Sequence, residues 1–216
     1  MKNQKRLYKY EIELEKQGYK YIAGVDEVGR GPLAAGVLAC ACILKFDSFI
    51  DGINDSKLLT EEKRNKLDKI IKKKTLAYAY GYVNEKEIDR INIYQATKLA
   101  MKRAINALKI KPDYLLIDAM TLDLDIDQKN IIKGDTLSAS IAAASILAKV
   151  KRDDIMTKFA KIYPNYGFHK HKGYPTRMHL DNLNKYKPCK IHRRSYKPVK
   201  HFYIHQQTFD LGGQND

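Results

Sequence analysis

Four carboxylates are placed along the chain where they can do divalent-metal chemistry. They are Asp26, Glu27, Asp118 and Asp135, and each follows an apolar stretch that is typical of a β-strand. Strand ends in one sheet can converge on a common point. Mg²⁺ takes oxygen ligands in near-octahedral geometry and keeps several waters, so a few carboxylates and substrate oxygens complete its shell. The spacing therefore predicts a site for Mg²⁺ or Mn²⁺.

A structural explanation exists for each acid taken alone, because Asp and Glu often end strands or cap helices. Asp135 has this alternative, since a helix is expected just after it. Asp26 and Glu27 are harder to explain, because two like charges directly after an apolar strand cost free energy unless a cation lies nearby. Two ions about 3.5–4 Å apart can activate a water and stabilise the leaving oxygen in one displacement. We therefore expect a two-ion site.

The segments that would position these acids are expected to be strands and helices, because their apolar residues show the spacing of one or the other. Glycines and a proline at positions 29–32 indicate a turn between two strands, and Thr60 is a candidate helix cap. We expect strands at 21–25, 35–44, 76–83, 113–117 and 131–133, and helices at 4–17, 60–73, 92–108 and 137–163. The fold class is mixed α/β.

The net charge of +15 favours an anionic partner. Between residues 149 and 205 there are 15 Lys and Arg against 3 Asp, so most of the excess lies in the last third of the chain. A basic surface beside carboxylates suits a site that cuts phosphodiesters. Nucleic acid is the expected partner.

Length and composition predict one main domain with an appendage. We expect the domain at 1–163, with an N-terminal helix within 1–17, a basic helical segment at 164–205 and a flexible tail at 206–216. No apolar stretch is long enough for a membrane span or a secretion signal, which predicts a cytoplasmic protein. The three cysteines show no metal-binding spacing. A monomer is expected, because no heptad pattern appears.

Several long motifs give the chain a strong resemblance to ribonuclease HII, the type 2 ribonuclease H family. They occur in the family's order, and the resemblance covers about residues 20–200. The motifs are GVDEVGRGPLAAGV at 24–37, DSK at 55–57, LLID at 115–118, GDTLSASIAAASILAKVKRD at 134–153, HKGYPT at 171–176 and HRRSYKPV at 192–199.

The resemblance implies a ribonuclease H-like fold, with a mixed sheet flanked by helices and a small C-terminal helical segment. It implies that the four carboxylates are the catalytic metal ligands. Family members cut RNA/DNA hybrids and nick duplex DNA on the 5′ side of an embedded ribonucleotide, leaving a 3′-hydroxyl and a 5′-phosphate, which serves ribonucleotide removal. This chain departs from the family at Ala119, where glycine is common, so the shape of the loop 119–128 does not follow from the resemblance.

Substrate recognition is expected from two places. Gly29, Arg30 and Gly31 offer backbone N–H groups that can approach a phosphate or a 2′-hydroxyl closely. Tyr174 resembles the family tyrosine that contacts the ribose, with Tyr166 as the second choice. Candidate phosphate contacts are Ser56, Lys57 and Lys172.

Two features of the basic third are ambiguous. All six histidines fall there, and without cysteine partners at metal-binding spacing we expect them on the surface rather than on zinc. In the tail, Gln206, Phe209 and Leu211 loosely resemble peptides by which repair enzymes dock onto sliding clamps, although a frayed terminus explains them as well.

Two other functions compete with this interpretation. The chain can be a basic duplex-binding protein without catalysis, but the presence of all four acids argues against that. The sister type 3 ribonuclease H shares the fold, yet it carries a long N-terminal domain and lacks the GRG arrangement. Only 25 residues precede Asp26 here, which favours type 2.

Overall fold

The computed structural model describes residues 7–46, 48–53, 56 and 59–210, with side chains to residue 204. Lys57 and residues 211–216 of the tail lie outside this part of the chain. Among the described helices, none combines the length and the apolar character that crossing a membrane requires.

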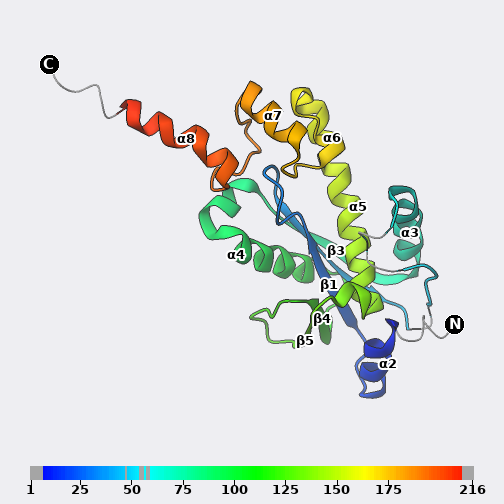
Figure 1. The fold of residues 1–216 in the computed structure, drawn as a ribbon. Helices are drawn as coiled ribbons and strands as arrows, with labels where there is room; N and C mark the ends of the chain where they lie inside the picture. Colours follow the sequence, from blue (N-terminus) through cyan, green and yellow to red (C-terminus); the bar gives the residue numbers. More distant parts are fainter. Residues whose placement is uncertain (1–6, 47, 54–55, 57–58, 211–216) are drawn as a thin grey trace. The chain divides into compact units, whose positions relative to one another are not determined.

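A five-stranded mixed sheet forms the centre of the fold, in the order β3-β2-β1-β4-β5. Strand β1 pairs antiparallel with β2 and parallel with β4, which pairs parallel with β5. The sheet and its flanking helices confirm the predicted fold class (Figure 1). The strands are β1 Ile22–Val28, β2 Val37–Leu44, β3 Thr75–Val83, β4 Tyr114–Asp118 and β5 Asp127–Ile131.

Strand β1 continues through the acidic pair, so the prediction that these residues lie beyond a strand end is wrong. Asp26 and Glu27 are opposite Cys40 and Ala39 of β2. On its other side β1 pairs with β4 only to Val25, opposite Ile117. The next residue of β4 is Asp118, so the acids lie where the parallel pairing stops and the antiparallel hairpin goes on.

The helices largely match the expected ranges. They are α2 Lys9–Lys16, α3 Glu61–Lys74, α4 Glu85–Asn106, α5 Ala139–Ile162, α6 Phe168–His171, α7 Arg177–Tyr186 and α8 Lys197–Asp210. Thr60 caps α3 as predicted, since its hydroxyl accepts a hydrogen bond from the backbone N–H of Lys63. Helix α8 extends into the segment 206–210 that was expected to be flexible.

Helix α4 begins earlier than predicted because a short helical turn precedes the expected start. Asn92 is not helical, with φ 64° and ψ 166°, and its side chain accepts from the N–H of Gln95, as a cap does. Ahead of it, Asn84 and Glu87 exchange side-chain and backbone hydrogen bonds in a capping box. Two capped segments therefore join at Asn92.

Strand β5 lies earlier than expected, so Asp135 does not follow a strand end. The strand covers Asp127–Ile131, and Lys133 then adopts a left-handed conformation with φ 58°. Asp135 lies in the 3-10 turn Gly134–Thr136 that follows. Ala119 also has a positive φ, 49°, a conformation that costs a side chain about 1–2 kcal/mol and that glycine adopts freely.

The start of α5 packs directly on β1, as its small residues predict. A Cβ atom at Gly24 would lie 2.0 Å from the backbone carbon of Ser140 and 2.3 Å from the backbone nitrogen of Ile141. Gly81 of β3 is equally close to α4, with a Cβ position 2.0 Å from the carbonyl oxygen of Ala100. Both helices therefore depend on glycine at the strand for their distance from the sheet.

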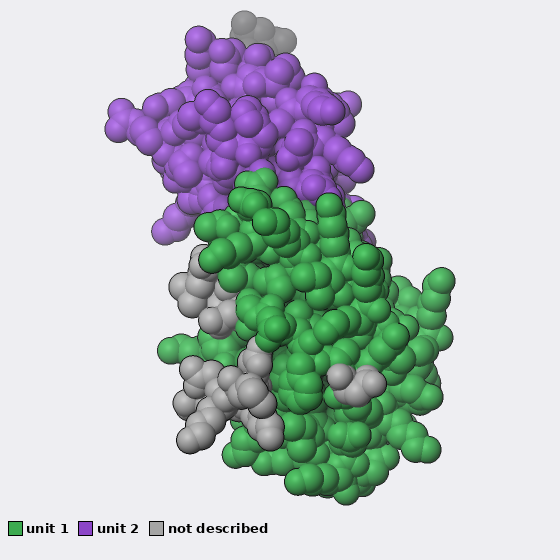
Figure 2. Space-filling view, turned by 90° about the vertical axis from the view of Figure 1, so that its right-hand side faces the viewer, with its two compact units in different colours: residues 1–28, 38–82, 97–152 green, residues 29–37, 83–96, 153–216 purple. Residues whose placement is uncertain are grey.

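The chain divides into two compact units that interleave along the sequence (Figure 2). Unit 1 contains residues 1–28, 38–82 and 97–152, with the whole sheet except the ends of β2 and β3. Unit 2 contains residues 29–37, 83–96 and 153–216. The loop between β1 and β2 thus belongs to the same unit as α6, α7 and α8.

Unit 2 has its own apolar core. Phe168 is fully buried and stacks on Tyr166, with ring centroids 5.2 Å apart and an interplanar angle of 5°. Ala34 and Ala35 of the β1–β2 loop pack in the same cluster with Met156. A second cluster joins Leu33 of this loop to Leu183 and Val199. The loop is therefore held by the packing of the C-terminal helices.

We predict that Gly24→Ala destabilises the protein by about 3 kcal/mol, because the added methyl group overlaps the backbone of α5. The melting temperature should fall by roughly 6–12 °C. Gly18→Ala is the control, since Gly18 has φ 98° but open space around it and should cost about 1 kcal/mol through strain alone. Equal effects of the two changes would contradict the close packing of α5.

Candidate metal centre and nucleic-acid interface

Three of the four predicted carboxylates meet in unit 1. Asp26, Glu27 and Asp118 each offer an oxygen, and these atoms all lie within 4.8 Å of one another. Asp26 is 5% exposed, and the other two are half-buried. Neighbours on a strand normally point to opposite faces, but Asp26 Oδ1 accepts the backbone N–H of Glu27 at 2.7 Å, which turns its carboxylate along the strand.

The electrostatics of this cluster favour a cation. Burial raises the pKa of Asp26 well above its ordinary value, and the charges of Glu27 and Asp118 raise it further. Hydrogen bonds from the Ser145 side chain and from the Glu27 backbone act in the opposite direction. The net effect is still a raised pKa, and three oxygen donors at mutual ligand distance fit a hard divalent ion.

Ser56 lies behind the cluster rather than on a surface where phosphate would bind. It is 4% exposed, and its hydroxyl is 2.9 Å from the hydroxyl of Ser145 on α5. Since Ser145 also hydrogen-bonds Asp26, the three side chains form a chain that leads to the carboxylate. We infer that Ser56 supports Asp26. The phosphate contact of Lys57 stays a prediction.

Asp135, the fourth predicted ligand, is buried with 6% exposure in its 3-10 turn. That turn is tied to Asp118, because Asp118 Oδ1 accepts the backbone N–H of Gly134 at 2.7 Å. Among the described residues, Asp135 does not belong to the group within 4.8 Å. Asp135 is the next residue after Gly134, whose N–H bonds Asp118 of the cluster, and its role as a metal ligand stays a prediction.

Glu11 of α2 holds the start of α5, which follows this turn. Its Oε1 accepts the N–H of Ser140 at 2.9 Å and the hydroxyl of Ser138 at 2.6 Å, and the Ser140 hydroxyl bonds it as well. A carboxylate at a helix N-terminus satisfies N–H groups that lack a partner in the helix and complements the helix dipole. The N-terminal helix thereby fixes the end of α5 nearest Asp135.

The predicted recognition residues meet in unit 2. A Cβ atom at Gly31 would lie 3.6 Å from Cε1 of the Tyr174 ring, so the GRG loop and the tyrosine are neighbours. Tyr174 is 40% exposed, which suits a ring that stacks on a sugar or base. Lys172, which has φ 52°, is half-exposed two residues away. Tyr166 is 6% exposed, so its burial removes it as the second choice.

Three of the histidines are buried, so the prediction that all six lie on the surface is wrong. His171, His179 and His192 have exposures of 8%, 0% and 2%. The Nε2 atoms of His179 and His192 are 3.1 Å apart, and Nδ1 of His179 donates to the carbonyl of Tyr174 at 2.9 Å. Burial lowers the pKa of each of these two residues to about 4, so both rings are neutral near pH 7.

Comparison with known proteins agrees with this geometry. The family model of Ribonuclease HII matches residues 23–199. The chain belongs to this family. Ribonuclease HII of Desulfitobacterium hafniense is 56% identical over 206 residues, which are 95% of this chain and 77% of that protein. The chain is thus a type 2 ribonuclease H, an endonuclease that acts on RNA/DNA.

Solved structures agree with the fold. The ribonuclease H2 of Pyrococcus horikoshii superposes with a TM-score of 0.74 at 25% identity, and the match covers 87% of this chain and 99% of that one. The ribonuclease HII in a PCNA complex from Archaeoglobus fulgidus gives 0.70 at 19% identity, over 82% of this chain and 95% of that one. The second likeness supports the fold alone.

Sequence reasoning missed the residues that support the site from a distance. Ser145 lies in a helix whose small residues were explained by packing, and Glu11 lies more than a hundred residues from the helix that it caps. His192 and Arg193 lie in the quoted motif HRRSYKPV, but no role was derived for them. A buried histidine or arginine in a basic segment has no local pattern that separates it from exposed ones.

We predict that Asp26→Asn raises the melting temperature of the metal-free protein near pH 7. The raised pKa means that the folded state disfavours the ionised carboxylate. The resulting cost in stability is absent below the ordinary carboxyl pKa, grows as the pH rises from that value to the raised folded value, and is constant above it. Removing the charge should add about 1 kcal/mol or more, roughly 2–4 °C or more. Mg²⁺ should stabilise the wild type and have a smaller effect on the variant.

The control for this measurement is Asp123→Asn, because the Asp123 side chain is fully exposed and should change the melting temperature little. A lower melting temperature for Asp26→Asn in metal-free buffer would show that the Asp26 charge stabilises the fold and that the cluster needs no cation.

Proposed function

We propose that the chain is a divalent-metal-dependent endoribonuclease that hydrolyses the RNA strand of RNA/DNA hybrids and nicks duplex DNA on the 5′ side of embedded ribonucleotides. Its products are a 3′-hydroxyl and a 5′-phosphate, and its role is ribonucleotide removal in DNA repair and replication. The observation that supports this best is the approach of Asp26, Glu27 and Asp118 to within 4.8 Å. We place this activity in the cytoplasm.

The carboxylates would bind a pair of Mg²⁺ or Mn²⁺ ions together with Asp135. Bound there, the ions would supply an activated water for attack on phosphorus and charge stabilisation for the departing 3′-oxygen. Asp26 keeps its orientation through Ser145 and the backbone of Glu27. Asp118 is oriented by the N–H of Gly134. No side chain needs to act as the nucleophile.

Recognition of the ribonucleotide would come from unit 2. The N–H groups of Gly29, Arg30 and Gly31 would contact the 2′-hydroxyl, and the Tyr174 ring would stack on the sugar. Lys172 would neutralise backbone phosphate. Val28 connects directly to Gly29 along the chain, so the strand that would carry two metal ligands continues into the β1–β2 loop, residues 29–36, which we call the recognition loop.

A duplex-binding protein without catalysis explains the net charge equally well but not the carboxylate cluster. Carboxylates near the binding surface would weaken binding to phosphate, and clustering three of them at one buried or half-buried point costs stability unless a cation binds. The two functions differ in one result, because only the enzyme cuts the duplex when a divalent metal is added.

We predict metal-dependent nicking of a DNA duplex that contains one ribonucleotide, at its 5′ side, and loss of at least about 100-fold of this activity in Asp135→Asn. Asp123→Asn is the matched control and should retain activity, since its side chain is exposed. A hybrid of the same sequence, assayed in parallel, shows which substrate is preferred. No cleavage of either substrate with Mg²⁺ or Mn²⁺, or full activity of Asp135→Asn, would disprove the assignment.

A sliding clamp is the second partner that we propose, on the residue types of the tail 206–216 alone. The A. fulgidus relative was solved with PCNA, which shows that association for that protein. Deleting residues 206–216 should abolish binding to the clamp of the same organism and leave nicking of the short duplex unchanged. Equal clamp binding by the full chain and the truncated chain would reject the tail as the docking peptide.

A further inference from the structure

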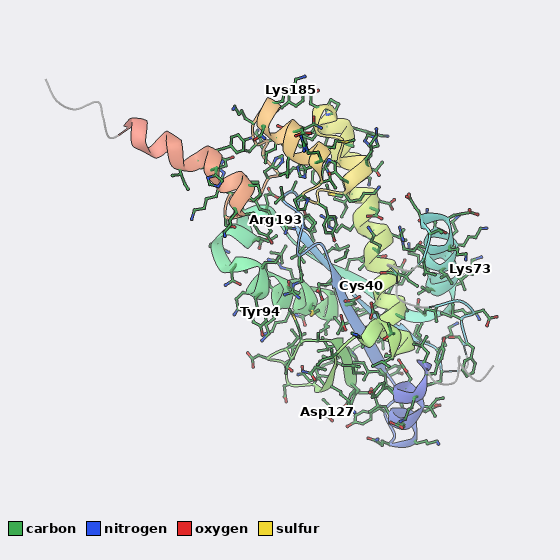
Figure 3. The ribbon with its side chains drawn as sticks, in the orientation of Figure 1. Cys40, Lys73, Tyr94, Asp127, Lys185 and Arg193 are labelled. Carbon is green, nitrogen blue, oxygen red and sulfur yellow. The ribbon has the colours of Figure 1, made fainter. Side chains whose placement is uncertain are left out.

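Arg193, labelled in Figure 3, is fully buried, and its guanidinium group donates hydrogen bonds to backbone carbonyls of the recognition loop. Nη2 donates to the carbonyl of Gly29 at 2.6 Å, Nη1 to the carbonyl of Arg30 at 2.8 Å and Nε to the carbonyl of Ala35 at 2.7 Å. The Tyr196 hydroxyl completes the network, because it accepts from Nη1 at 2.9 Å and donates to the Arg30 carbonyl at 2.6 Å.

The backbone around Arg193 fixes where this group lies. The N–H of Arg193 donates to the carbonyl of Leu33, and the N–H of Ala35 donates to the carbonyl of Ile191, both at 2.8 Å. His192 and Ala34 form an antiparallel bridge between these bonds. The segment 191–193 therefore pairs with residues 33–35 of the loop. This register places the guanidinium group at the carbonyls of Gly29 and Arg30, on the opposite side of the loop.

The direction of the loop's N–H groups follows from these carbonyl contacts and from peptide geometry. In a trans peptide the carbonyl and the following N–H point in opposite directions, and the described residues contain no cis peptide bond. Since the carbonyls of Gly29 and Arg30 point at Arg193, the N–H groups of Arg30 and Gly31 point away from it. Hydrogen bonds from a cation to the carbonyls also polarise these peptides and strengthen their N–H groups as donors.

Filling space does not explain an arginine at this position. Removing a charge from water is unfavourable unless hydrogen bonds offset the loss, and an apolar side chain fills the same volume without that cost. A guanidinium group is suited to fixing backbone orientation, because its rigid donors can hold several carbonyl groups at fixed angles. Here the carbonyls are those of the residues predicted to meet the ribose.

We propose that Arg193 is a positioning residue for ribonucleotide recognition, which holds the Gly29 and Arg30 carbonyls so that the N–H groups of Arg30 and Gly31 are preset to bind the 2′-hydroxyl. This inference rests on the proposed function and adds to it the residue that sets sugar specificity. Tyr196 assists by fixing the Arg30 carbonyl and one guanidinium nitrogen.

The test compares Arg193→Lys and Tyr196→Phe with Arg194→Lys, the same chemical change at the exposed neighbouring residue. Affinity is measured by fluorescence anisotropy for a duplex with one ribonucleotide and for the all-deoxy duplex of the same sequence. EDTA keeps both duplexes intact. The ratio of the two affinities isolates the 2′-hydroxyl, because phosphate contacts are common to both duplexes. Circular dichroism and thermal unfolding establish that each variant folds.

We expect the wild type and Arg194→Lys to prefer the ribonucleotide duplex. Arg193→Lys should lose about tenfold of this preference and Tyr196→Phe about two- to threefold, with all-deoxy affinity unchanged in both. If Arg193→Lys does not fold, Tyr196→Phe decides the question, because phenylalanine keeps the ring and removes only the hydroxyl.

An unchanged affinity ratio in the folded variants, or an equal loss of affinity for both duplexes, would overturn the role of Arg193. A wild type that nicks the ribonucleotide duplex but shows no preference in EDTA would also overturn it, since the loop would then not be preset. Failure of the proposed function gives a different result, namely a wild type that neither nicks nor prefers this duplex.

Discussion

Mutual repulsion among three carboxylates that the fold forces together is the constraint on which the rest of the structure depends. The register of β1 against β4 ends at Val25 and Ile117, which brings Asp26 and Asp118 to the same level of neighbouring strands. Antiparallel pairing with β2 keeps Glu27 in the sheet beside them. The arrangement costs stability in the absence of a cation, and the surrounding structure is built to hold it.

That support comes from segments far apart in the sequence. Ser145 of α5 bonds Asp26, Gly134 bonds Asp118, and Glu11 of α2 fixes the start of α5. Gly24 lets α5 approach β1 closely enough for these contacts. Packing, capping and hydrogen bonding thus all act on the position of two carboxylates, as a site that binds metal with defined geometry requires.

In unit 2 as well, the residues predicted to contact the substrate are held in place by others that would not touch it. Two of the three GRG residues are glycines without a side chain to pack, so the conformation of the loop depends on what its carbonyls bind, and Arg193 supplies those donors. Tyr174 is held through its carbonyl by the neutral pair His179 and His192. Neighbouring residues of one motif, His192 and Arg193, therefore serve the tyrosine and the loop respectively.

The sequence alone predicts those helices and strands whose pattern lies within a short stretch of residues. The apolar run of β2, the capped start of α3 and the small residues of α5 follow from composition and periodicity. The extent of β1 was not predictable, because only pairing with β2 keeps Asp26 and Glu27 in the strand. The shift of β5 had a different cause, because a polar edge strand shows no apolar alternation. Buried histidines and Arg193 depend on tertiary contacts that no window of residues contains.

The claim that the carboxylate cluster is a divalent-metal site can be tested directly by calorimetric titration of the metal-free protein with Mn²⁺. The structure predicts saturable binding to the wild type and a large loss of affinity in Asp118→Asn, which removes one of the three clustered charges. Absence of saturable binding, or equal affinity in Asp118→Asn, would contradict the account.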